Sequence, residues 1–457
     1  MLRVISNDDR GFGAGRGWAA TRGSGPRGWE SGEDVRSIGA SRWGRRLVAV
    51  GSAAALAMLA GCSGSKAAIS ASGNQVPASQ DGADQGDGGQ AVPEVPAARL
   101  ALRPADGARD VSPTSPVVVT AADGTLRAVA VTNDAGKQVS GRLSADRITW
   151  TSAEPLGYGK TYAVTATAAN TAGRQTKATA RFSTVTPVTY TLPYLFPGPS
   201  IKQVGIAQPI TVHFDEPIAD RAAAERALRV TATPATQGGW YWFDDQNVHW
   251  RPRTLWKPGT HVTVQAKVYG VNVGNGIYGQ QDVSTSFMIG PARVATIDDR
   301  THMMTVQISG KVVRHIPVSM GRGGCIEVKG KTICFTTESG VHVVQEKYAV
   351  KEMSSESYGL PVTDPLGYKE KIPLAVRISG GGVFVHAASW SVADQGVRNV
   401  SHGCVNISPA NADWFYHTFS YGDVVDIKHT AVTMRLYDKY GDWSLSWAKW
   451  LAGSALR

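Results

Sequence analysis

Residues 401–406 of the chain read Ser401-His402-Gly403-Cys404-Val405-Asn406. If this run is extended, side chains alternate between two faces, so His402, Cys404 and Asn406 share one face. Gly403, beside the thiol, lets a substrate or backbone approach closely because it carries no side chain. A strand that presents a thiol between an imidazole and a carboxamide predicts a β-rich catalytic domain with Cys404 as the nucleophile.

The general base expected for this thiol is His386, which ends the apolar run Val383-Phe384-Val385-His386, eighteen positions before Cys404. A thiol needs a lowered pKa to be mostly thiolate at neutral pH, and a neighbouring imidazolium supplies it. A base on a separate strand can approach the thiol head-on, whereas His402 on the same strand points alongside it. We therefore expect His402 to support His386, and the peptide after His386, at Ala387, to orient the imidazole through a backbone carbonyl.

Two other interpretations of these residues remain open from the pattern alone. One cysteine with two histidines could ligate zinc, but no Cys-x-x-Cys spacing and no acidic cluster accompany Cys404. Cys404 could also be an inert core residue with satisfied histidines nearby. The Ser-His-Gly-Cys-x-Asn pattern favours catalysis over both, so we expect no metal and no cofactor.

The chain has three further cysteines. Cys325 and Cys334 flank a Gly-containing turn between short β-like runs, and they could close a cross-strand disulfide in an exported protein. Cys62 ends the run Leu59-Ala60-Gly61-Cys62, which resembles a lipobox, a signal for lipidation of its cysteine. Cys404 is then the cysteine that remains unassigned. An odd cysteine in an exported protein is either reactive or intermolecular.

The N-terminus predicts an export signal. Arginines at 42, 45 and 46 precede an apolar run, residues 47–60, whose 14 residues are too few for a comfortable membrane span of ~20. Residues 1–61 are therefore expected to be a leader. Residues 62–96, rich in Gly, Ser, Ala, Gln and Asp, predict a flexible tether with a reach on the order of 30 Å.

The composition is that of a globular protein with several domains. The chain has 457 residues, with 42% hydrophobic and 18% charged residues. Nine Arg/Lys and five Asp/Glu precede residue 62, so +4 of the formal charge of +10 lies there and +6 is spread over the rest. This mild excess suits an anionic wall or membrane surface, but no Lys/Arg-dense stripe indicates nucleic-acid binding.

Residues 97–187 and 188–291 predict two tandem immunoglobulin-like β-sandwiches. Ile148-Thr149-Trp150 is echoed about 100 positions later by Val248-His249-Trp250, as β-branched and aromatic runs recur between turn signals. We expect the Trp and Tyr residues of both modules to pack in their cores.

One segment of the second module predicts a contact with the next domain. Residues 238–243 read Gly-Gly-Trp-Tyr-Trp-Phe, and alternation places Trp240 and Trp242 on one face. We expect this face to dock the catalytic domain.

Residues 292–429 predict the β-rich catalytic domain. Met304–Ile308 and Val312–Val318 flank a Ser-Gly-Lys turn and predict a hairpin. Asn411–Thr418, preceded by Ser408-Pro409 as helix start signals, is predicted to be a helix. We expect one or two short helices in this domain.

Residues 430–457 form a C-terminal extension that is rich in tryptophan. Trp443, Trp447 and Trp450 recur at spacings of four and three, which places three indoles on one face of a single helix. We expect this face to pack on the catalytic domain rather than on membrane or glycan, because an aromatic stripe usually seeks a core.

The motifs together resemble one enzyme family. Val385-His386, followed after fourteen residues by residues 401–406, is similar to the signature of L,D-transpeptidases. Ser357–Pro361, Gly382–His386 and Asn411–Tyr416, with two immunoglobulin-like modules and an N-terminal lipobox, resemble its mycobacterial and actinobacterial branch. The likeness covers roughly residues 188–428 well.

The resemblance implies a reaction with peptidoglycan stem peptides as partners. Cys404 would attack the carbonyl at the L-centre of diaminopimelate in a donor tetrapeptide and expel D-Ala. The thioester would pass to a diaminopimelate amine of an acceptor stem, giving a 3→3 cross-link, with His386 moving the proton. Carbapenems would acylate the same thiol.

The resemblance also implies further site residues. Backbone N–H groups around residues 402–404, centred on Gly403, would form the oxyanion hole. Substrate contacts are implied for Tyr358 on a flap-like segment, for Asn406, and for the pair Gly381 and Gly382.

Three features depart from the family pattern. Ala387 and Gly381 stand where relatives have Ser. The segment 321–338, which holds Cys325 and Cys334, replaces a short Thr-Pro-x-Gly-type stretch.

Two rival functions remain. The enzyme could use water or a protein as acceptor, as an L,D-carboxypeptidase or an anchoring enzyme. The tandem modules could also serve a non-catalytic peptidoglycan-binding scaffold, which would have no need of a thiol and base. In each case lipidation of Cys62 would attach the exported protein to the outer face of the cytoplasmic membrane, in the periplasm or cell wall.

Overall fold

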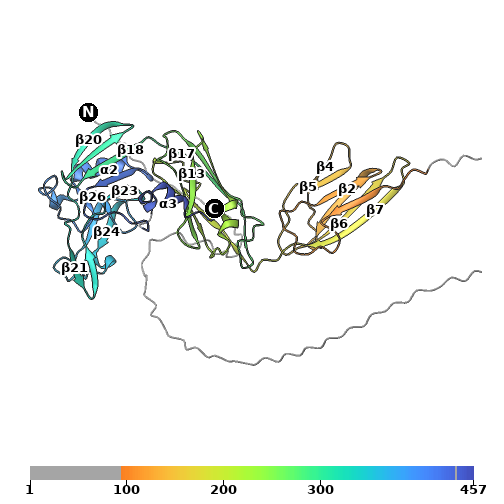
Figure 1. Cartoon of the computed structure of the whole chain (residues 1–457), viewed down its shortest axis with the longest axis horizontal. Helices are drawn as coiled ribbons and strands as arrows, with labels where there is room; N and C mark the ends of the chain where they lie inside the picture. The colour runs from red at the N-terminus through yellow and green to blue at the C-terminus, as the bar shows by residue number, and fades with distance from the viewer. Residues whose placement is uncertain (1–93, 438–439, 457) are drawn as a thin grey trace, which may run out of the picture. The chain divides into compact units, whose positions relative to one another are not determined.

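The computed structural model describes residues 94–437 and 440–456. The expected leader, the expected lipidation residue Cys62 and most of the expected tether lie outside the described residues. The described chain is mainly β and has three β-rich parts in sequence order, coloured orange to yellow, green, and cyan to blue (Figure 1). No helix in the described residues is long and apolar enough to cross a membrane.

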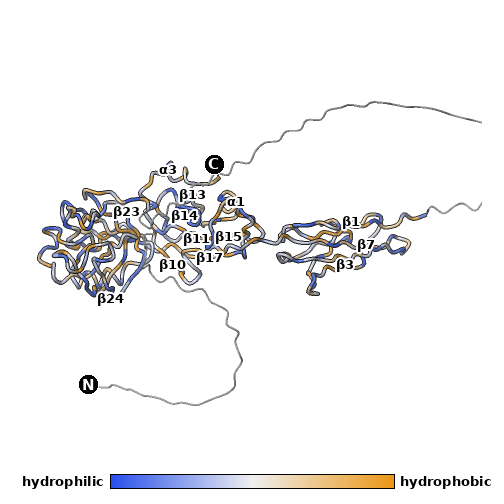
Figure 2. Tube along the Cα trace, turned by 90° about the horizontal axis from the view of Figure 1, so that it is seen from below, coloured by the Kyte–Doolittle hydropathy of each residue, from blue (hydrophilic) through white to orange (hydrophobic). Residues whose placement is uncertain are grey.

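Module 1 is a two-layer β-sandwich with antiparallel sheets of order β1-β2-β5-β4 and β3-β6-β7. Polar and apolar residues alternate along its strands (Figure 2), so that one face of each sheet is buried. Trp150 and Tyr162 lie in the core, where Tyr162 stacks on Phe182 with 5.4 Å between ring centroids. The strands are β1 (Arg99–Arg103), β2 (Val118–Ala122), β3 (Thr125–Asn133), β4 (Gly141–Leu143), β5 (Thr149–Ser152), β6 (Thr161–Ala169) and β7 (Gln175–Ser183).

Module 2 is a second sandwich, with sheets β10-β17-β15-β12 and β13-β14-β11-β9 and a small parallel pair, β16-β8. Its elements are β8 (Thr189–Thr191), β9 (Pro193–Phe196), β10 (Gln203–Val204), β11 (Ile210–Phe214), α1 (Arg221–Ala227), β12 (Leu228–Thr233), β13 (Gly238–Trp242), β14 (Asn247–Pro252), β15 (His261–Ala266), β16 (Ile277–Gly279) and β17 (Val283–Ile289). Helix α1 was not predicted from the sequence, although Asp220 caps it by accepting from the Ala223 N–H at 2.8 Å.

The two modules share a packing detail that explains the repeated tryptophan. Gly141 lies against the Trp150 ring, and Gly238 lies against the Trp250 ring. In each case an added Cβ would come within 1.9 Å of the indole. A glycine at this place lets the indole lie flat on the neighbouring strand.

The catalytic domain packs two sheets, β20-β19-β18-β28-β23 and β24-β25-β26-β27, around one apolar core. The predicted hairpin is present as β19 and β20, and the predicted helix is α2, which begins at Pro409 with Ser408 as its cap. The elements are β18 (Arg293–Asp298), β19 (Met303–Ile308), β20 (Lys311–Pro317), β21 (Cys325–Val328), β22 (Lys331–Cys334), β23 (Gly340–Val343), β24 (Glu346–Ser354), β25 (Lys369–Arg377), β26 (Phe384–Ala387), β27 (Val405–Ile407), α2 (Pro409–Thr418) and β28 (Val424–Lys428), with 3-10 turns at Ser355–Tyr358 (η1) and Ser389–Ser391 (η2).

The C-terminal extension differs from the single helix expected. Trp443 lies in a 3-10 turn, η3 (Gly441–Ser444), and the other two tryptophans lie in α3 (Trp447–Leu451). Leu445 between them is extended, with φ −90° and ψ 141°, and Ser446 then caps α3. The expectation of one continuous helix was therefore wrong.

The three indoles nevertheless converge on one side chain, Arg251 of β14. Its guanidinium carbon lies 4.8 Å from the Trp443 ring, 5.5 Å from Trp447 and 4.7 Å from Trp450. Arg251 also donates to the Leu445 carbonyl at 2.9 Å. We call this contact of the extension with module 2 the junction.

The junction corrects two further expectations. The three indoles lie around Arg251 of module 2, where α3 lies beside β13 (Figure 1). The extension also contacts the catalytic domain, through η3 beside β23 and through the Met434 N–H, which donates to the Ser339 carbonyl at 2.8 Å. Trp240 and Trp242 are buried in the core of module 2, and the opposite face of β13 makes the contact. There the Trp450 indole donates to the Gly239 carbonyl at 2.8 Å and stacks on Tyr241 at 4.9 Å. The strand period was right, but the larger side chains of this strand fill the core of their own module.

Candidate active site

The candidate base and the candidate nucleophile lie on adjacent parallel strands. β26 and β27 pair with His386 opposite Asn406, so these two side chains share the face that points away from the main core. Val385 and Val405, one residue earlier on each strand, are buried in the core between the sheets. Cys404 immediately precedes β27, on the same edge of the site.

The nucleophile segment is bent, which corrects the extended run expected from the sequence. Residues 402–404 form a bend and β27 begins only at Val405. Gly403 has φ +137°, a backbone conformation that residues with a Cβ rarely adopt. Ser401 closes the bend, because its hydroxyl donates to the Cys404 carbonyl at 2.7 Å and accepts from the Gly403 N–H at 3.0 Å.

The bend also changes the expected oxyanion hole. Since the Gly403 N–H already donates to the Ser401 hydroxyl, it is engaged within the loop. This N–H could therefore stabilise an oxyanion, as expected, only after its hydrogen bond to Ser401 has opened. The Cys404 N–H lies on the next peptide, whose carbonyl accepts from the Thr337 hydroxyl at 2.8 Å.

The Cys404 thiol is partly exposed and packs against a small apolar cluster that contains Phe384, on which Tyr348 and Tyr368 also pack. Its hydrogen bond goes to the Gly382 carbonyl, with 3.8 Å between Sγ and the oxygen. Burial raises the pKa of the thiol to about 11, although the Phe384 N–H and the Arg377 cation act in the opposite direction. The resting nucleophile is therefore a neutral thiol.

His386 is 4% exposed, and its Nδ1 donates to the Ala387 carbonyl at 2.9 Å. A carbonyl only accepts, so the proton is on Nδ1 and the lone pair is on Nε2. Burial lowers the pKa of His386, and the bond to Ala387 offsets this in part. The neutral imidazole differs from the imidazolium expected to lower the thiol pKa, because both groups are desolvated.

His402 occupies different surroundings from those expected for a neighbour of the thiol on the same strand face. Its Nε2 lies 3.0 Å from the Leu366 carbonyl and also contacts the Arg322 guanidinium. Its ring packs on Tyr368 at 4.9 Å and edge-on to Phe335 at 5.3 Å. Burial and then the Arg322 cation lower the pKa of His402.

The implied substrate residues lie around the thiol to different degrees. Tyr358 ends η1, is half-buried, and has a pKa raised by burial, with a smaller contribution from Cys404. Gly381 and Gly382 form the turn between β25 and β26, and Gly382 supplies the carbonyl at the thiol. Asn406 is 2% exposed, and its amide donates to the Ser391 hydroxyl at 3.0 Å.

Three aromatic or cationic neighbours were missed by the sequence analysis. Trp390 is 58% exposed and its ring lies 6.0 Å from His386, nearly parallel to it. Tyr368 and Arg377 come from β25 and its approach, 18 and 9 residues before His386. In the sequence, Trp390 could have been identified as a neighbour of the site by its position four residues after His386, between two serines.

Cys325 and Cys334 are bonded across the β21–β22 hairpin, where they stand directly opposite each other. Within residues 94–437 and 440–456, no group of three or more His, Cys, Asp or Glu side chains is placed to hold a metal ion.

Comparisons with known proteins agree with this fold. A family model described as the L,D-transpeptidase catalytic domain matches residues 292–427, and one for a bacterial Ig domain matches residues 108–272. Fold and site thus define a mainly β protein in which immunoglobulin-like modules precede a transpeptidase-type domain. The chain belongs to the L,D-transpeptidase family, and this membership supports acyltransferase-type activity on peptidoglycan.

Two of the relatives span most of this chain. It is 43% identical to L,D-transpeptidase 2 of Mycobacterium tuberculosis (strain CDC 1551 / Oshkosh), over 78% of this chain and 85% of the relative. It is 39% identical to L,D-transpeptidase 5 of Mycobacterium tuberculosis (strain ATCC 25618 / H37Rv), over 79% and 78%. Among solved structures, it is similar to an L,D-transpeptidase from Mycobacterium smegmatis, with 36% identity, a TM-score of 0.42, and coverage of 52% of this chain and 99% of that one.

Proposed function

We propose that this protein forms 3→3 cross-links in peptidoglycan through a thioester on Cys404. The observation that carries the proposal is the fixed tautomer of His386 on the strand next to the nucleophile. Because the Ala387 carbonyl holds the proton on Nδ1, Nε2 is the nitrogen that can take a proton from a thiol.

In the first half-reaction, the Cys404 sulfur attacks the carbonyl of the third residue of a donor tetrapeptide. Since the pKa of the thiol is raised to about 11 and that of His386 is lowered, both start neutral at pH 7. The proton therefore moves from Sγ to His386 Nε2 as the carbon–sulfur bond forms. His386 then returns this proton to the departing D-Ala amine, and the thioester remains.

In the second half-reaction, the side-chain amine of an acceptor diaminopimelate attacks the thioester carbonyl. His386 takes the amine proton and gives it to the departing sulfur, which restores the thiol. The resting bond from the thiol to Gly382 must break first, and catalytic hydrogen bonds often form only with substrate bound.

Intact mass spectrometry tests the nucleophile. Incubation with a carbapenem should add the mass of one inhibitor molecule to the wild type and nothing to Cys404→Ala. Absence of an adduct on folded wild-type protein would sink the assignment.

The product that the protein forms from a disaccharide-tetrapeptide substrate shows which acceptor it uses. A cross-linked dimer supports transpeptidation, and release of a tripeptide alone would make the protein an L,D-carboxypeptidase. Transfer to a protein amine with no dimer would make it an anchoring enzyme.

We further propose that the protein is exported and lipidated at Cys62, as its N-terminal sequence predicts. Labelling cells with a radioactive fatty acid should mark the wild type but not Cys62→Ala. Equal labelling of both proteins, or labelling of neither, would contradict the anchor.

A further inference from the structure

The disulfide hairpin, which we define as residues 321–337, joins two segments that run beside the nucleophile. Cys325 and Cys334 close it covalently. On the side of the disulfide away from the hairpin turn, the Phe335 N–H donates to the Gly324 carbonyl at 3.0 Å, and the Gly323 N–H donates to the Phe335 carbonyl at 3.3 Å. The two segments, residues 321–324 and 335–337, are thus tied to each other.

One segment ends in Thr337, which contacts the peptide of the nucleophile. Its side chain is buried, accepts from the Gly321 N–H at 2.9 Å and donates to the Gly403 carbonyl at 2.8 Å. The Gly403 carbonyl and the Cys404 N–H belong to one trans peptide, in which these groups point in opposite directions. Thr337 therefore sets the direction of the Cys404 N–H.

The other segment holds the start of the same loop. The Arg322 N–H donates to the Ser401 carbonyl at 2.9 Å, and the Ser401 N–H donates to the Met320 carbonyl at 2.9 Å. Because the Ser401 hydroxyl closes the bend over Cys404, both segments of the hairpin fix the nucleophile loop.

The tip of the hairpin contacts the flap-like segment that carries Tyr358. The Lys331 ammonium donates to the Tyr358 carbonyl at 2.9 Å. Ile333 and Phe335 are buried with Leu360, and Tyr358 packs against this cluster. A single covalently closed element thus touches both the nucleophile peptide and the flap.

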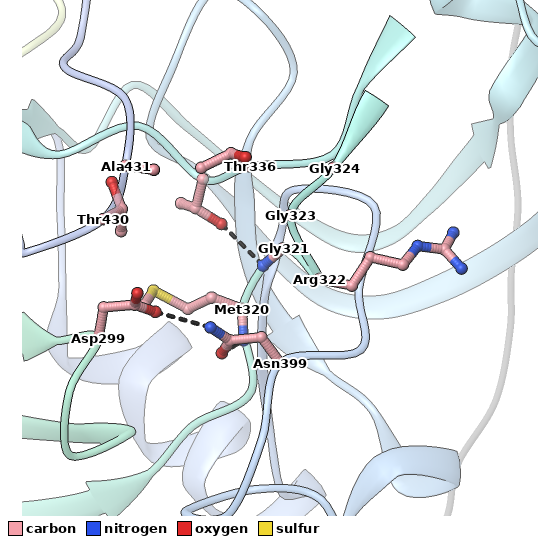
Figure 3. Close-up of a pocket in the computed structure, with 11 residues that line it drawn as sticks. Asp299, Met320, Gly321, Arg322, Gly323, Gly324, Thr336, Asn399, Thr430 and Ala431 are labelled. Carbon is pink, nitrogen blue, oxygen red and sulfur yellow. Dashed lines mark hydrogen bonds between the residues drawn. The ribbon is translucent and has the colours of Figure 1, made fainter. Parts of the chain in front are cut away.

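The segment 321–324 has one further anchor, the Arg322 side chain, which contacts the His402 ring nitrogen and lies over the Phe335 ring, 4.7 Å from its centroid. A cavity of roughly 190 Å³ lies along it, also lined by Asp299, Asn399, Thr336 and Thr430. Figure 3 shows the Asn399 amide bonded to Asp299 across this cavity and Arg322 pointing away from it. Gly323 and Gly324 have positive φ and open space around them, whereas Gly321 packs closely against the Phe335 carbonyl. The place of the segment therefore depends on this packing, on the hydrogen bonds and on the disulfide.

We propose that Thr337 is a positioning residue for the nucleophile peptide, and that the disulfide hairpin holds Thr337 and the Tyr358 flap in fixed positions relative to each other. This rests on the function proposed above. The hydroxyl of Thr337 acts on the acylation step through the Cys404 N–H, and Lys331 acts on donor binding through the flap.

Three variants test the role of Thr337. Thr337→Val removes the hydroxyl at similar volume, Thr337→Ser keeps it, and Thr336→Val makes the same change one residue away. We expect Thr337→Val to slow acylation by a carbapenem about tenfold, as the loss of one hydrogen bond to the reacting peptide would. In turnover of a disaccharide-tetrapeptide its kcat should fall with KM unchanged, while Thr337→Ser and Thr336→Val stay within about threefold of wild type.

The outcomes separate this inference from the proposed function. Wild type that forms no adduct overturns both. Wild type that reacts, with Thr337→Val reacting as fast or Thr337→Ser as slowly as Thr337→Val, overturns the role of the hydroxyl alone.

The hairpin is tested without touching Thr337. Cys325→Ser/Cys334→Ser should lower kcat and raise KM for the donor, each about threefold or more, whereas Lys331→Met should raise KM alone. A non-thiol phosphine reductant should reproduce the double variant's effect in the wild type and change nothing in the double variant. Wild-type kcat and KM in the double variant would overturn the role of the hairpin.

Discussion

Two histidines in this protein are each oriented through Nδ1, one in the active site and one at the junction. His386 donates to the backbone carbonyl of Ala387 at 2.9 Å, and His249 of β14 bonds the carboxylate of Asp442 at 3.0 Å. By partner alone, the second pair looks more like a catalytic His–carboxylate dyad. Its ring, however, lies against Phe243 at 4.4 Å and near Tyr440 at 6.1 Å, whereas His386 lies opposite Asn406, two residues after the thiol. The orienting partner therefore does not identify the base; the position of the histidine beside the nucleophile loop does.

The surroundings of the two histidines also differ in what they stabilise. At the junction, the buried Arg251 lies among three indoles and ties the C-terminal extension to module 2. Glu225 of α1 adds to this attachment by accepting from the Ala455 N–H at 2.8 Å and from the Trp242 indole at 2.9 Å. We expect changes at the junction to affect stability and changes at the active site to affect rate.

The largest expected effect is on rate and comes from His386→Ala. Loss of a general base should slow acylation by a carbapenem about 10²–10⁴-fold. His249→Ala is the matched control, and its acylation rate should stay within about twofold of wild type. Equal losses of rate in two folded variants would remove the distinction between the two histidines.

A large effect on stability is expected from Arg251→Met. The change removes a desolvated cation from three aromatic rings and should cost about 2–4 kcal/mol of the free energy of unfolding. Arg253→Met, an exposed arginine two residues on, should cost within about 0.5 kcal/mol. Denaturant unfolding measures both, and the acylation rate of folded Arg251→Met should match wild type. A stable Arg251→Met protein would mean that the extension is held by other contacts.

The pH dependence of acylation sharpens the assignment of the active-site pair. Burial lowers the pKa of His386 below 6.5, so the base stays neutral and the wild-type rate should fall only below that pH. Because the pKa of the thiol is raised to about 11, the rate should be flat between about pH 7 and 9. In His386→Ala only the thiolate reacts, so its residual rate should rise about tenfold per pH unit over that range. A wild-type rate that also rises tenfold per unit would show reaction through free thiolate instead.

The smallest expected effect is from Asp442→Asn. Asparagine keeps an oxygen for His249 but removes the carboxylate that raises the pKa of Arg251 against the effect of burial. We expect a loss of about 1 kcal/mol in the free energy of unfolding and no change in the rate of acylation. A rate loss like that of His386→Ala would identify the junction histidine as part of the catalytic machinery.

The sequence predicted features that depend on local periodicity and on short signals. The β-sandwich repeat, the hairpin of β19 and β20 and the cap of α2 at Ser408 all follow from residues close together in the chain. The bend at residues 402–404 was missed because it depends on the Ser401 hydroxyl and on Thr337, 66 residues before Gly403.

The sequence by itself determined the family and the mainly β architecture, because signature spacing and alternation are properties of the chain alone. Only the tertiary structure decided which face of β13 contacts the extension. It also decided that three indoles, from η3 and α3, lie around Arg251. It also decided that the thiol and His386 are both neutral at rest, since desolvation depends on segments brought together from across the fold.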